Sequence, residues 1–266
     1  MQNLQPLLSS PSTGVLVTGG ASGIGLASAR ALSAIGRPVA IWDIDARRAE
    51  AAAALICTEF GAQWNCACGL PAIGFGVDLR SPEAIAAAAD ATRQRLPSLG
   101  GIVHCAGIVD TGSLEGITLD SWADGINIHL RPIVLLLQTF LEDLKRQPGS
   151  AVVATASINA TLGNGINPVY SAAKGGVLSL VRSLADRLAH DGIRINSVSP
   201  GYVETPMTRP AIDVLPPGFF ERRILLERVG AAEEIGRVVR FLLSDEASYI
   251  TAAEIVVDGG NISSQR

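Results

Sequence analysis

Charged residues are scarce in this sequence, and positive charge is not in excess. Only 17% of the 266 residues are charged, and 21 Lys and Arg stand against 25 Asp and Glu. A dedicated nucleic-acid-binding protein needs surplus Lys and Arg to neutralise phosphates, so this class is excluded. A net charge of only -4 and a hydrophobic fraction of 48% also exclude a disordered chain.

Long apolar runs and cysteines are few as well. No apolar run reaches the roughly 18 residues that cross a bilayer. Met1–Thr13 lacks a charged segment followed by an apolar one, so no secretory signal is predicted. Four cysteines without such a signal indicate free thiols in a reducing cytoplasm. Cys66 and Cys68 have no second pair and no nearby histidine, and structural zinc needs four ligands, so no metal site is predicted.

Short apolar segments alternate along the chain with Ala- and Leu-rich segments of helical character. The expected strands are 14–18, 38–42, 73–77, 101–105, 151–156, 193–198 and 254–257. The expected helices are 24–35, 46–60, 82–96, 119–146, 169–190 and 233–243. This alternation indicates βαβ units, and nearly all-apolar strands fit a sheet buried on both faces. The prediction is an α/β fold: a single doubly wound (Rossmann) domain whose seven-stranded parallel sheet has helices on both faces.

No linker or internal repeat divides the chain, and its length is ample to bury one core. We expect residues 1–12 to form a flexible tail and residues 13–266 to form one domain. Two stretches interrupt the alternation. Residues 61–76 are long for a helix-to-strand connection, and residues 205–229 contain four prolines. Loops of this length in compact domains are usually functional or mobile.

A glycine-rich turn joins the first expected strand to the first expected helix. It reads TGGASGIG over residues 18–25, with Gly19, Gly23 and Gly25 at the junction. Phosphate binding needs a tight turn, backbone without Cβ atoms beside the oxygens, and a helix N-terminus aimed at the anion. The turn meets these needs, so we predict a dinucleotide site here; a tight turn without a ligand is the alternative.

An acidic residue, Asp43, ends the second expected strand, 18 residues past Gly25 of the turn. A carboxylate at this place accepts hydrogen bonds from the adenosine ribose and repels a 2′-phosphate, which favours NAD over NADP. Alternatively, Asp43 caps the helix that follows, a task that Asp45 can perform equally well. Arg47 and Arg48 could meet a 2′-phosphate instead.

Tyr170 and Lys174 lie four residues apart in an expected helix, which puts them on one face. A tyrosine pKa of about 10 is too high for a base at neutral pH. A nearby cation favours the phenolate, so we expect Lys174 to lower the pKa of Tyr170. Ser157 follows an expected strand, at the sheet edge where ligands bind. Ser157 and Tyr170 can together hold a substrate oxygen while a hydride moves.

These motifs, in this order, resemble the short-chain dehydrogenase/reductase family over about residues 14–261. The shared marks are TGGASGIG at 18–25, Asp43, Asp78, Ala106-Gly107, Asn127, Ser157, Tyr170 with Lys174, Pro200-Gly201 with Thr205, and Val257-Asp258-Gly259-Gly260. Several ordered motifs are far more specific together than any one alone. The resemblance implies that residues 13–266 are a dinucleotide-binding oxidoreductase domain with a nicotinamide cofactor, and that the chain forms a homotetramer.

The resemblance also implies roles for single residues. In the catalytic set Tyr170 is the general acid/base, Ser157 orients the substrate oxygen, Lys174 tunes Tyr170 and binds the nicotinamide ribose, and Asn127 holds a water in a proton relay. Asp78 is expected at the adenine, Thr205 at the carboxamide, and Pro200 and Val203 along the nicotinamide. The full cofactor set is Gly19, Ser22, Gly23, Ile24, Asp43, Asp78, Leu79, Ala106, Gly107, Tyr170, Lys174, Pro200, Val203 and Thr205. The substrate set is Ser157, Asn159, Leu162, Asn164, Tyr170 and Tyr202.

The sequence departs from the family after the fourth strand, where His104 and Cys105 replace two asparagines. A buried neutral imidazole at position 104 can supply one donor and one acceptor in place of the first asparagine. Cys105 is expected to be a small buried hydrophobe. We expect His129 and His190 to be exposed or satisfied by their neighbours.

The function predicted is an NAD-dependent oxidoreductase that interconverts a secondary alcohol and a ketone. Residues 208–229 carry several large apolar side chains and predict an apolar lid over a largely apolar substrate, although Arg209, Arg222 and Arg223 in the same segment could meet an acidic group. One alternative is an NADPH-dependent 3-oxoacyl-thioester reductase, against which Asp43 argues. Another is a non-catalytic dinucleotide sensor, which would need no proton-transferring tyrosine.

Overall fold

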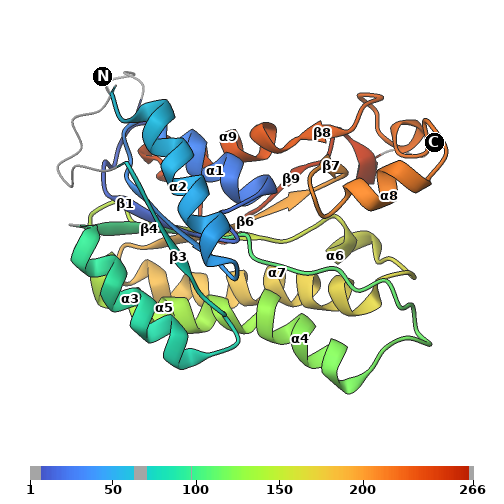
Figure 1. The fold of residues 1–266 in the computed structure, drawn as a ribbon, viewed down its shortest axis with the longest axis horizontal. Coiled ribbons are helices and arrows are strands. Elements are labelled where there is room, and N and C mark those ends of the chain that lie inside the picture. Colours follow the sequence, from blue (N-terminus) through green and yellow to red (C-terminus); the bar gives the residue numbers. More distant parts are fainter. Residues whose placement is uncertain (1–6, 63–70, 97, 264–266) are drawn as a thin grey trace.

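A parallel sheet forms the centre of the computed structural model, which describes residues 7–62, 71–96 and 98–263. Seven strands lie in the order β3-β2-β1-β4-β5-β6-β9 (Figure 1). Their bounds are β1 Gly14–Thr18, β2 Val39–Asp43, β3 Ala72–Gly76, β4 Leu99–His104, β5 Ala151–Thr155, β6 Arg194–Pro200 and β9 Glu254–Val257. Each neighbouring pair in this sheet is parallel. The predicted seven-stranded parallel sheet is confirmed.

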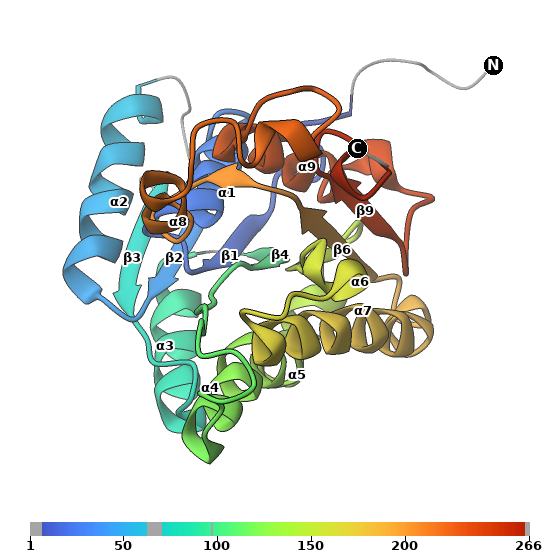
Figure 2. The same cartoon turned by 90° about the vertical axis from the view of Figure 1, so that its right-hand side faces the viewer.

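Helices cover both faces of the sheet, as Figures 1 and 2 show. One face carries α1 Gly23–Ser33, α2 Ala46–Phe60 and α9 Ala232–Leu242. The other carries α3 Pro82–Arg95, α4 Leu119–His129, α5 Arg131–Lys145 and α7 Pro168–Ala189. The chain winds from β1 to β3 in one direction and from β4 onward in the other. This is the doubly wound arrangement predicted for the chain, and it leaves a crevice at the carboxyl ends of β1 and β4.

The segment 119–146, expected to be one helix, forms two. Helix α4 ends at His129, and α5 begins at Arg131 with a proline in its first turn. Pro132 has no N–H to donate, and its ring crowds the carbonyl four residues earlier, so a straight helix cannot continue through it. The expectation of a continuous helix is therefore wrong at this point.

Several short elements, which were not predicted from the sequence, lie around the carboxyl edge of the sheet. They are α6 Asn159–Leu162, α8 Arg209–Val214, the 3-10 turns η1 Glu221–Arg223 and η3 Asn261–Ser263, and the strands β7 Val203–Glu204 and β8 Gly230–Ala231. A further 3-10 turn, η2 Asp245–Ala247, lies at the opposite, amino edge, where Asp245 bonds to Ser10. Strands β7 and β8 pair with each other in parallel and so close the segment 205–229 at its base. Two-residue strands carry no periodic pattern, which is why they escaped prediction.

The described part of the expected tail is hydrogen-bonded to η2. The N–H of Leu7 donates to Glu246 at 3.0 Å, and the N–H of Asp245 donates to the carbonyl of Ser10 at 2.7 Å. The Ser10 hydroxyl also bonds to the Asp245 carboxylate. Residues 7–10 thus differ from the loose tail expected for them. Residues 1–6 lie outside the described residues, as do Cys66, Cys68 and most of the long connection around them.

Neither a membrane-spanning helix nor a metal-binding cluster is found among the described residues. No helix there combines the length and hydropathy of a membrane span. No group of three or more His, Cys, Asp or Glu side chains there is placed to hold a metal ion. Cys57 and Cys105 are free thiols.

The buried side chain of Arg37 links the segment before β1 to the segment after α9. Its side chain is 1% exposed and donates to the backbone carbonyls of Thr13 and Leu243, each at 2.8 Å. Burial lowers the pKa of Arg37 to about 10, so the group is charged at neutral pH. R37M keeps most of the apolar stem but leaves both carbonyls without this donor. We expect R37M to lower the free energy of unfolding by about 3 kcal/mol, measured by urea denaturation.

The matched control is R182M, which removes a half-exposed guanidinium whose nearest carboxylate, on Glu254, is 3.7 Å away. We expect it to change the free energy of unfolding by less than about 0.5 kcal/mol. Equal losses for the two variants would show that Arg37 does not hold the fold through its buried bonds.

Candidate active site

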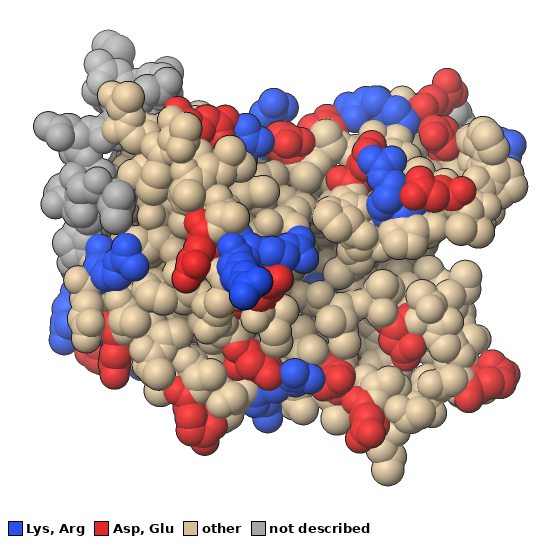
Figure 3. Space-filling model, in the orientation of Figure 1, with Lys and Arg blue, Asp and Glu red and all other residues tan. Residues whose placement is uncertain are grey.

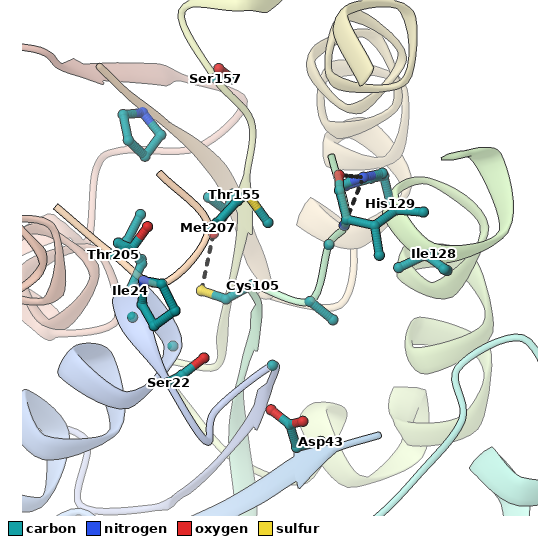
Figure 4. A pocket seen from close by; sticks show the side chains of 18 of the residues that line it. Ser22, Ile24, Asp43, Cys105, Ile128, His129, Thr155, Ser157, Thr205 and Met207 are labelled. Atoms are coloured by element: carbon teal, nitrogen blue, oxygen red, sulfur yellow. Dashed lines mark hydrogen bonds between the residues drawn. The ribbon is translucent and has the colours of Figure 1, made fainter. Parts of the chain in front are cut away.

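A cavity of ≈ 370 Å³ lies at the carboxyl ends of the central strands. Figure 4 shows its walls, with Ser22 and Thr205 on one side and Ile128 and His129 on the other. The molecule is visibly hollowed near this edge, and positive and negative side chains are interspersed on the face that Figure 3 shows. Ligands of doubly wound sheets bind at this place, where the winding direction reverses.

The glycine turn between β1 and α1 lines one side of the cavity. Gly19 has a φ of +62° and Gly23 a φ of +51°, conformations that other residues rarely adopt. A Cβ on Gly25 would lie 2.1 Å from the carbonyl oxygen of Gly19, so no other residue fits there. Ser22, the N-cap residue of α1, makes no side-chain capping bond within the described structure. The N-terminus of α1 therefore faces the cavity with backbone donors to offer, which fits the pyrophosphate of a dinucleotide.

Asp43 ends β2 and lines the same cavity. The residue that caps α2 is its neighbour Asp45 and not Asp43. Asp45 caps α2 by accepting from the N–H of Arg48 at 3.1 Å. Asp43 accepts instead from the N–H of Ala21 at 3.2 Å and from that of Asp45 at 3.3 Å. These two bonds orient the Asp43 carboxylate and leave it lone pairs for a ribose diol. Arg48 lines the cavity too.

Asp78, which was predicted to meet the adenine, lines the wall together with Leu79 of the predicted cofactor set. Both carboxylate oxygens of Asp78 accept from the guanidinium of Arg80, at 2.9 to 3.2 Å. The hydrogen bonds from Arg80 lower the pKa of Asp78, so the carboxylate is ionised at neutral pH. Arg80 also approaches Asp124 of α4 at 3.5 Å. Arg80 was not predicted as a partner of Asp78, because it belongs to no recognised motif.

Ser157, Tyr170 and Lys174 meet at the opposite end of the cavity. The Ser157 oxygen accepts from the N–H of Asn159 at 3.1 Å, and its side chain also hydrogen-bonds Tyr170. Lys174 is 3% exposed and donates to the carbonyl of Thr155, the last residue of β5, at 2.5 Å. Burial lowers the pKa of Lys174 to about 8. The three side chains are thus assembled as the spacing predicted.

The expected effect of Lys174 on Tyr170 is wrong for this structure. Burial raises the pKa of Tyr170, and a hydrogen bond with Ser157 offsets only part of the rise. The ammonium lies 5.6 Å from the centre of the Tyr170 ring and is bonded to Thr155. The loss of water around the phenol outweighs any cation at this distance, because the charged form loses most on burial.

His104 braces the sheet as predicted from its chemistry. Its Nδ1 lies 2.8 Å from the Thr18 hydroxyl, and its Nε2 lies 3.1 Å from the carbonyl of His129. A carbonyl only accepts, so Nε2 donates and Nδ1 accepts from Thr18. Burial lowers the pKa of His104 to about 3, which keeps the ring neutral. The expectation of one donor and one acceptor is confirmed. Cys105 is buried less completely than expected, and its Sγ lies 3.1 Å from the Thr155 hydroxyl.

Asn127 was expected at the site, and His129 was expected to be exposed or satisfied by its neighbours. Both lie on α4, but the cavity wall includes Ile128 and His129 and not Asn127. His129 is 1% exposed, and its ring meets that of Tyr170 edge-on with centroids 5.3 Å apart. No sequence motif indicated this place of His129, because the rotation of α4 about its axis depends on how the helix packs.

Every residue of the predicted cofactor set lines the cavity, but only Ser157 and Tyr170 of the substrate set do. Asn159 donates to Asn167 at 3.3 Å, and Asn164 accepts from the N–H of Ile166 at 3.0 Å. Tyr202 packs on Phe220 with ring centroids 4.3 Å apart, and Leu162 is 56% exposed. Asn159, Asn164 and Tyr202 thus contact residues outside the predicted substrate set, and the Leu162 side chain is exposed. Of the predicted apolar lid, residues 208–229, only Thr208 lines the cavity, together with Pro206 and Met207 just before the lid. Within the lid, the rings of Phe219 and Phe220 pack edge-on with centroids 5.2 Å apart.

Comparison with known proteins gives consistent matches over the whole fold. A family model described as enoyl-(acyl carrier protein) reductase matches residues 19–261. A probable galactose dehydrogenase of Rhizobium meliloti is 35% identical over 253 residues, which are 93% of this chain and 94% of that protein. The 3-oxoacyl-(acyl-carrier-protein) reductase of Escherichia coli is 32% identical over 245 residues, 92% of this chain and 95% of that protein.

Levodione reductase of Leifsonia aquatica is 34% identical over 255 residues, 92% of each protein. A crystal structure of levodione reductase superposes with a TM-score of 0.86 and 33% identity, and the match covers 95% of this chain and 98% of that one. A glucose/ribitol dehydrogenase of the short-chain type from Brucella melitensis gives a TM-score of 0.84 and 29% identity, with coverage of 94% and 96%.

Proposed function

The chain belongs to the short-chain dehydrogenase/reductase family, and from this premise we propose that it is an NAD-dependent enzyme that interconverts a secondary alcohol and a ketone. The family carries oxidoreductase activity with NAD or NADP. The observation that carries the proposal is that one cavity joins Ser157, Tyr170 and Lys174 to the glycine turn and Asp43. A dinucleotide that spans this cavity would bring its reactive ring to the three side chains.

Each side chain has a distinct task in the oxidative direction. Tyr170 takes the hydroxyl proton of the alcohol, and Ser157 donates a hydrogen bond to the same oxygen. Lys174 holds a positive charge beside both and has N–H groups beyond the one bonded to Thr155. The bound nicotinamide supplies the hydride acceptor. The chain's own contribution is orientation and control of protons.

NAD is favoured by the charge at the ribose end of the cavity. Asp43 is not needed to cap α2, since Asp45 does that. A carboxylate at this place binds a ribose diol and repels a 2′-phosphate. Arg48 on the same wall supports the alternative of an NADPH-dependent 3-oxoacyl-thioester reductase, the reaction in the name of one relative.

An apolar substrate is favoured by the residues at the mouth of the cavity. Ile108 and Met207 line it and are 38% and 41% exposed. Burial of such side chains against an apolar substrate stabilises the complex by about 25 cal/mol for each Å² removed from water. The homotetramer and the cytoplasmic location stay predictions.

Y170F is expected to abolish turnover while it leaves NADH binding nearly intact, because it removes only the proton-carrying oxygen. The assay is a screen of steroids, aryl carbinols, polyols and hydroxyacyl thioesters with NAD, read by the absorbance of the reduced cofactor. NADH binding is measured by fluorescence. Turnover by Y170F equal to that of the wild type would contradict the proposal. A wild-type chain that binds NADH and turns over none of these alcohols would favour a sensor.

D43A is expected to shift the ratio of kcat/KM for NAD to that for NADP by about tenfold or more towards NADP, because it removes the carboxylate that repels the 2′-phosphate. D45A is the matched control two residues away. It removes a helix cap and should cost about 1 kcal/mol of stability with no change in cofactor preference. A wild-type preference for NADPH would refute the ribose assignment and support the thioester reductase.

The rate of alcohol oxidation is expected to rise with pH. Tyr170 acts as a base only when deprotonated, and burial raises its pKa, so the active form is a minority at neutral pH. Below that pKa its population grows about tenfold for each pH unit. Ketone reduction needs the protonated phenol and should not rise. The measurement is kcat/KM in both directions from about pH 6 to about pH 10. Oxidation that is fastest at the acidic end would contradict this role of Tyr170.

A further inference from the structure

Ser157 and Tyr170 belong to two segments that a glycine-containing loop connects. Ser157 lies two residues before α6, Tyr170 lies in the first turn of α7, and α6 lies against α7 (Figure 2). The connection contains Gly163 and Gly165, and a Cβ at either place would meet no atom within 4 Å beyond its chain neighbours. A surface loop of this kind does not by itself fix the distance between the segments that it joins.

A pair of side chains, which we call the amide bridge, joins the two segments directly. Nδ2 of Asn159, the first residue of α6, donates to Oδ1 of Asn167 at 3.3 Å. Asn167 is the N-cap residue of α7 and is 9% exposed. Its side chain makes no capping bond to the helix, so its oxygen is available to Asn159. The bond is partly buried, and a hydrogen bond is stronger where water is scarce.

Each end of the amide bridge lies next to a side chain that acts in the proposed reaction. The N–H of Asn159 donates to the Ser157 oxygen at 3.1 Å, and Asn167 precedes Tyr170 by about one helical turn. The backbone carbonyl of Asn167 also accepts from the N–H and the hydroxyl of Ser171, at 3.0 and 3.1 Å. Asn167 is thus fixed to the turn that holds Tyr170. Neither asparagine lines the cavity, so the bridge acts on the reaction through Ser157 and Tyr170.

The separation of Ser157 from Tyr170 has a chemical consequence. Both side chains have to reach one substrate oxygen, and an error of about 1 Å in such a geometry costs about 100-fold in rate. The two side chains are hydrogen-bonded to each other, which lowers the pKa of Tyr170 against the larger rise that burial causes. Lys174 and His129 also face the Tyr170 ring, and neither is part of the amide bridge.

We propose that Asn159 and Asn167 are positioning residues, whose side-chain hydrogen bond holds Ser157 and Tyr170 at the separation that one substrate oxygen requires. The inference rests on the proposed function, because this separation matters only if both side chains act on the same oxygen. Each amide needs the other, so the two positions should behave as one unit in mutant kinetics.

Leucine variants remove the amide bridge with little change in side-chain shape. We expect N159L and N167L each to lower kcat roughly tenfold in both directions, the loss for one buried hydrogen bond. The double variant N159L/N167L should be no slower than the slower single variant, since either substitution already breaks the bond. KM for NAD should stay within about twofold of wild type, because neither residue lines the cavity.

Aspartate variants restore an acceptor for the bridge. In N159D or N167D the remaining amide donates to the new carboxylate. Each should keep kcat for ketone reduction within about threefold of wild type. Ketone reduction is the readout because it uses the protonated phenol, which an added negative charge does not deplete. The double variant N159D/N167D has acceptors without a donor and should be roughly as slow as N167L.

The pH profile separates positioning from a loss of packing. Without the amide bridge the bond between Ser157 and Tyr170 weakens, so the pKa of Tyr170 rises. The increase of alcohol oxidation with pH should therefore move to higher pH in N159L and N167L. A site that merely opened to water would move it to lower pH, because burial is what raises the pKa of Tyr170.

S183A is the matched control on α7. The exposed hydroxyl of Ser183 donates to the carbonyl of Ser179 at 2.9 Å, about four helical turns from Asn167. Its removal should leave kcat and the pH profile unchanged. Thermal unfolding and NADH binding verify that each variant is folded. Should N167L not fold, N159L against N159D makes the same comparison at the less buried position.

The proposal is overturned if N159L and N167L keep the wild-type kcat, or if their losses multiply in the double variant. It is also overturned if each single aspartate variant is as slow as its leucine counterpart, or if the pH profile moves to lower pH. Failure of the proposed function looks different. In that case Y170F keeps wild-type turnover, or the wild-type chain oxidises no secondary alcohol, whatever the asparagine variants do.

Discussion

The site depends on the hydrogen bond that the buried ammonium group of Lys174 donates to the carbonyl of Thr155. Lys174 is 3% exposed, and a charge placed out of water costs free energy unless acceptors surround it. The structure supplies one acceptor in the carbonyl of Thr155, at the end of β5. That bond ties α7, which carries both Tyr170 and Lys174, to the carboxyl edge of the sheet. The chemistry of the site and the packing of its longest helix are therefore coupled.

Two histidines near this charge, His104 and His129, are neutral, so each can make only the hydrogen bonds of a neutral imidazole. Burial and the charge of Lys174 lower the pKa values of His104 and His129 to about 3 and about 2. A neutral imidazole has one donor and one acceptor. His104 uses both, and so links Thr18 of β1 to the last residue of α4. His129 uses its donor on Ile108 and leaves its acceptor to the cavity.

Much of the architecture follows from local sequence. Strand and helix positions came close to the observed ones, because side-chain periodicity reflects which faces are buried. The glycine turn was predictable for a similar reason, since a Cβ on Gly25 would collide with Gly19 in any sequence that makes this turn. The two-residue strands β7 and β8 were not, because their pairing joins segments far apart in the chain. Asp43 and Asp45 were equal candidates for the helix cap until the backbone fixed which carboxylate reaches the N–H of Arg48.

The sequence by itself determined the strand order along the chain, the phosphate-binding turn and the spacing of Tyr170 and Lys174. All of these depend on short-range sterics and periodicity. Only the tertiary structure decided that His129 rather than Asn127 lines the cavity, since the rotation of α4 is set by its packing and by the proline that ends it. Only the tertiary structure decided the pKa of Tyr170, because burial removes water from the phenol and burial belongs to the folded chain alone.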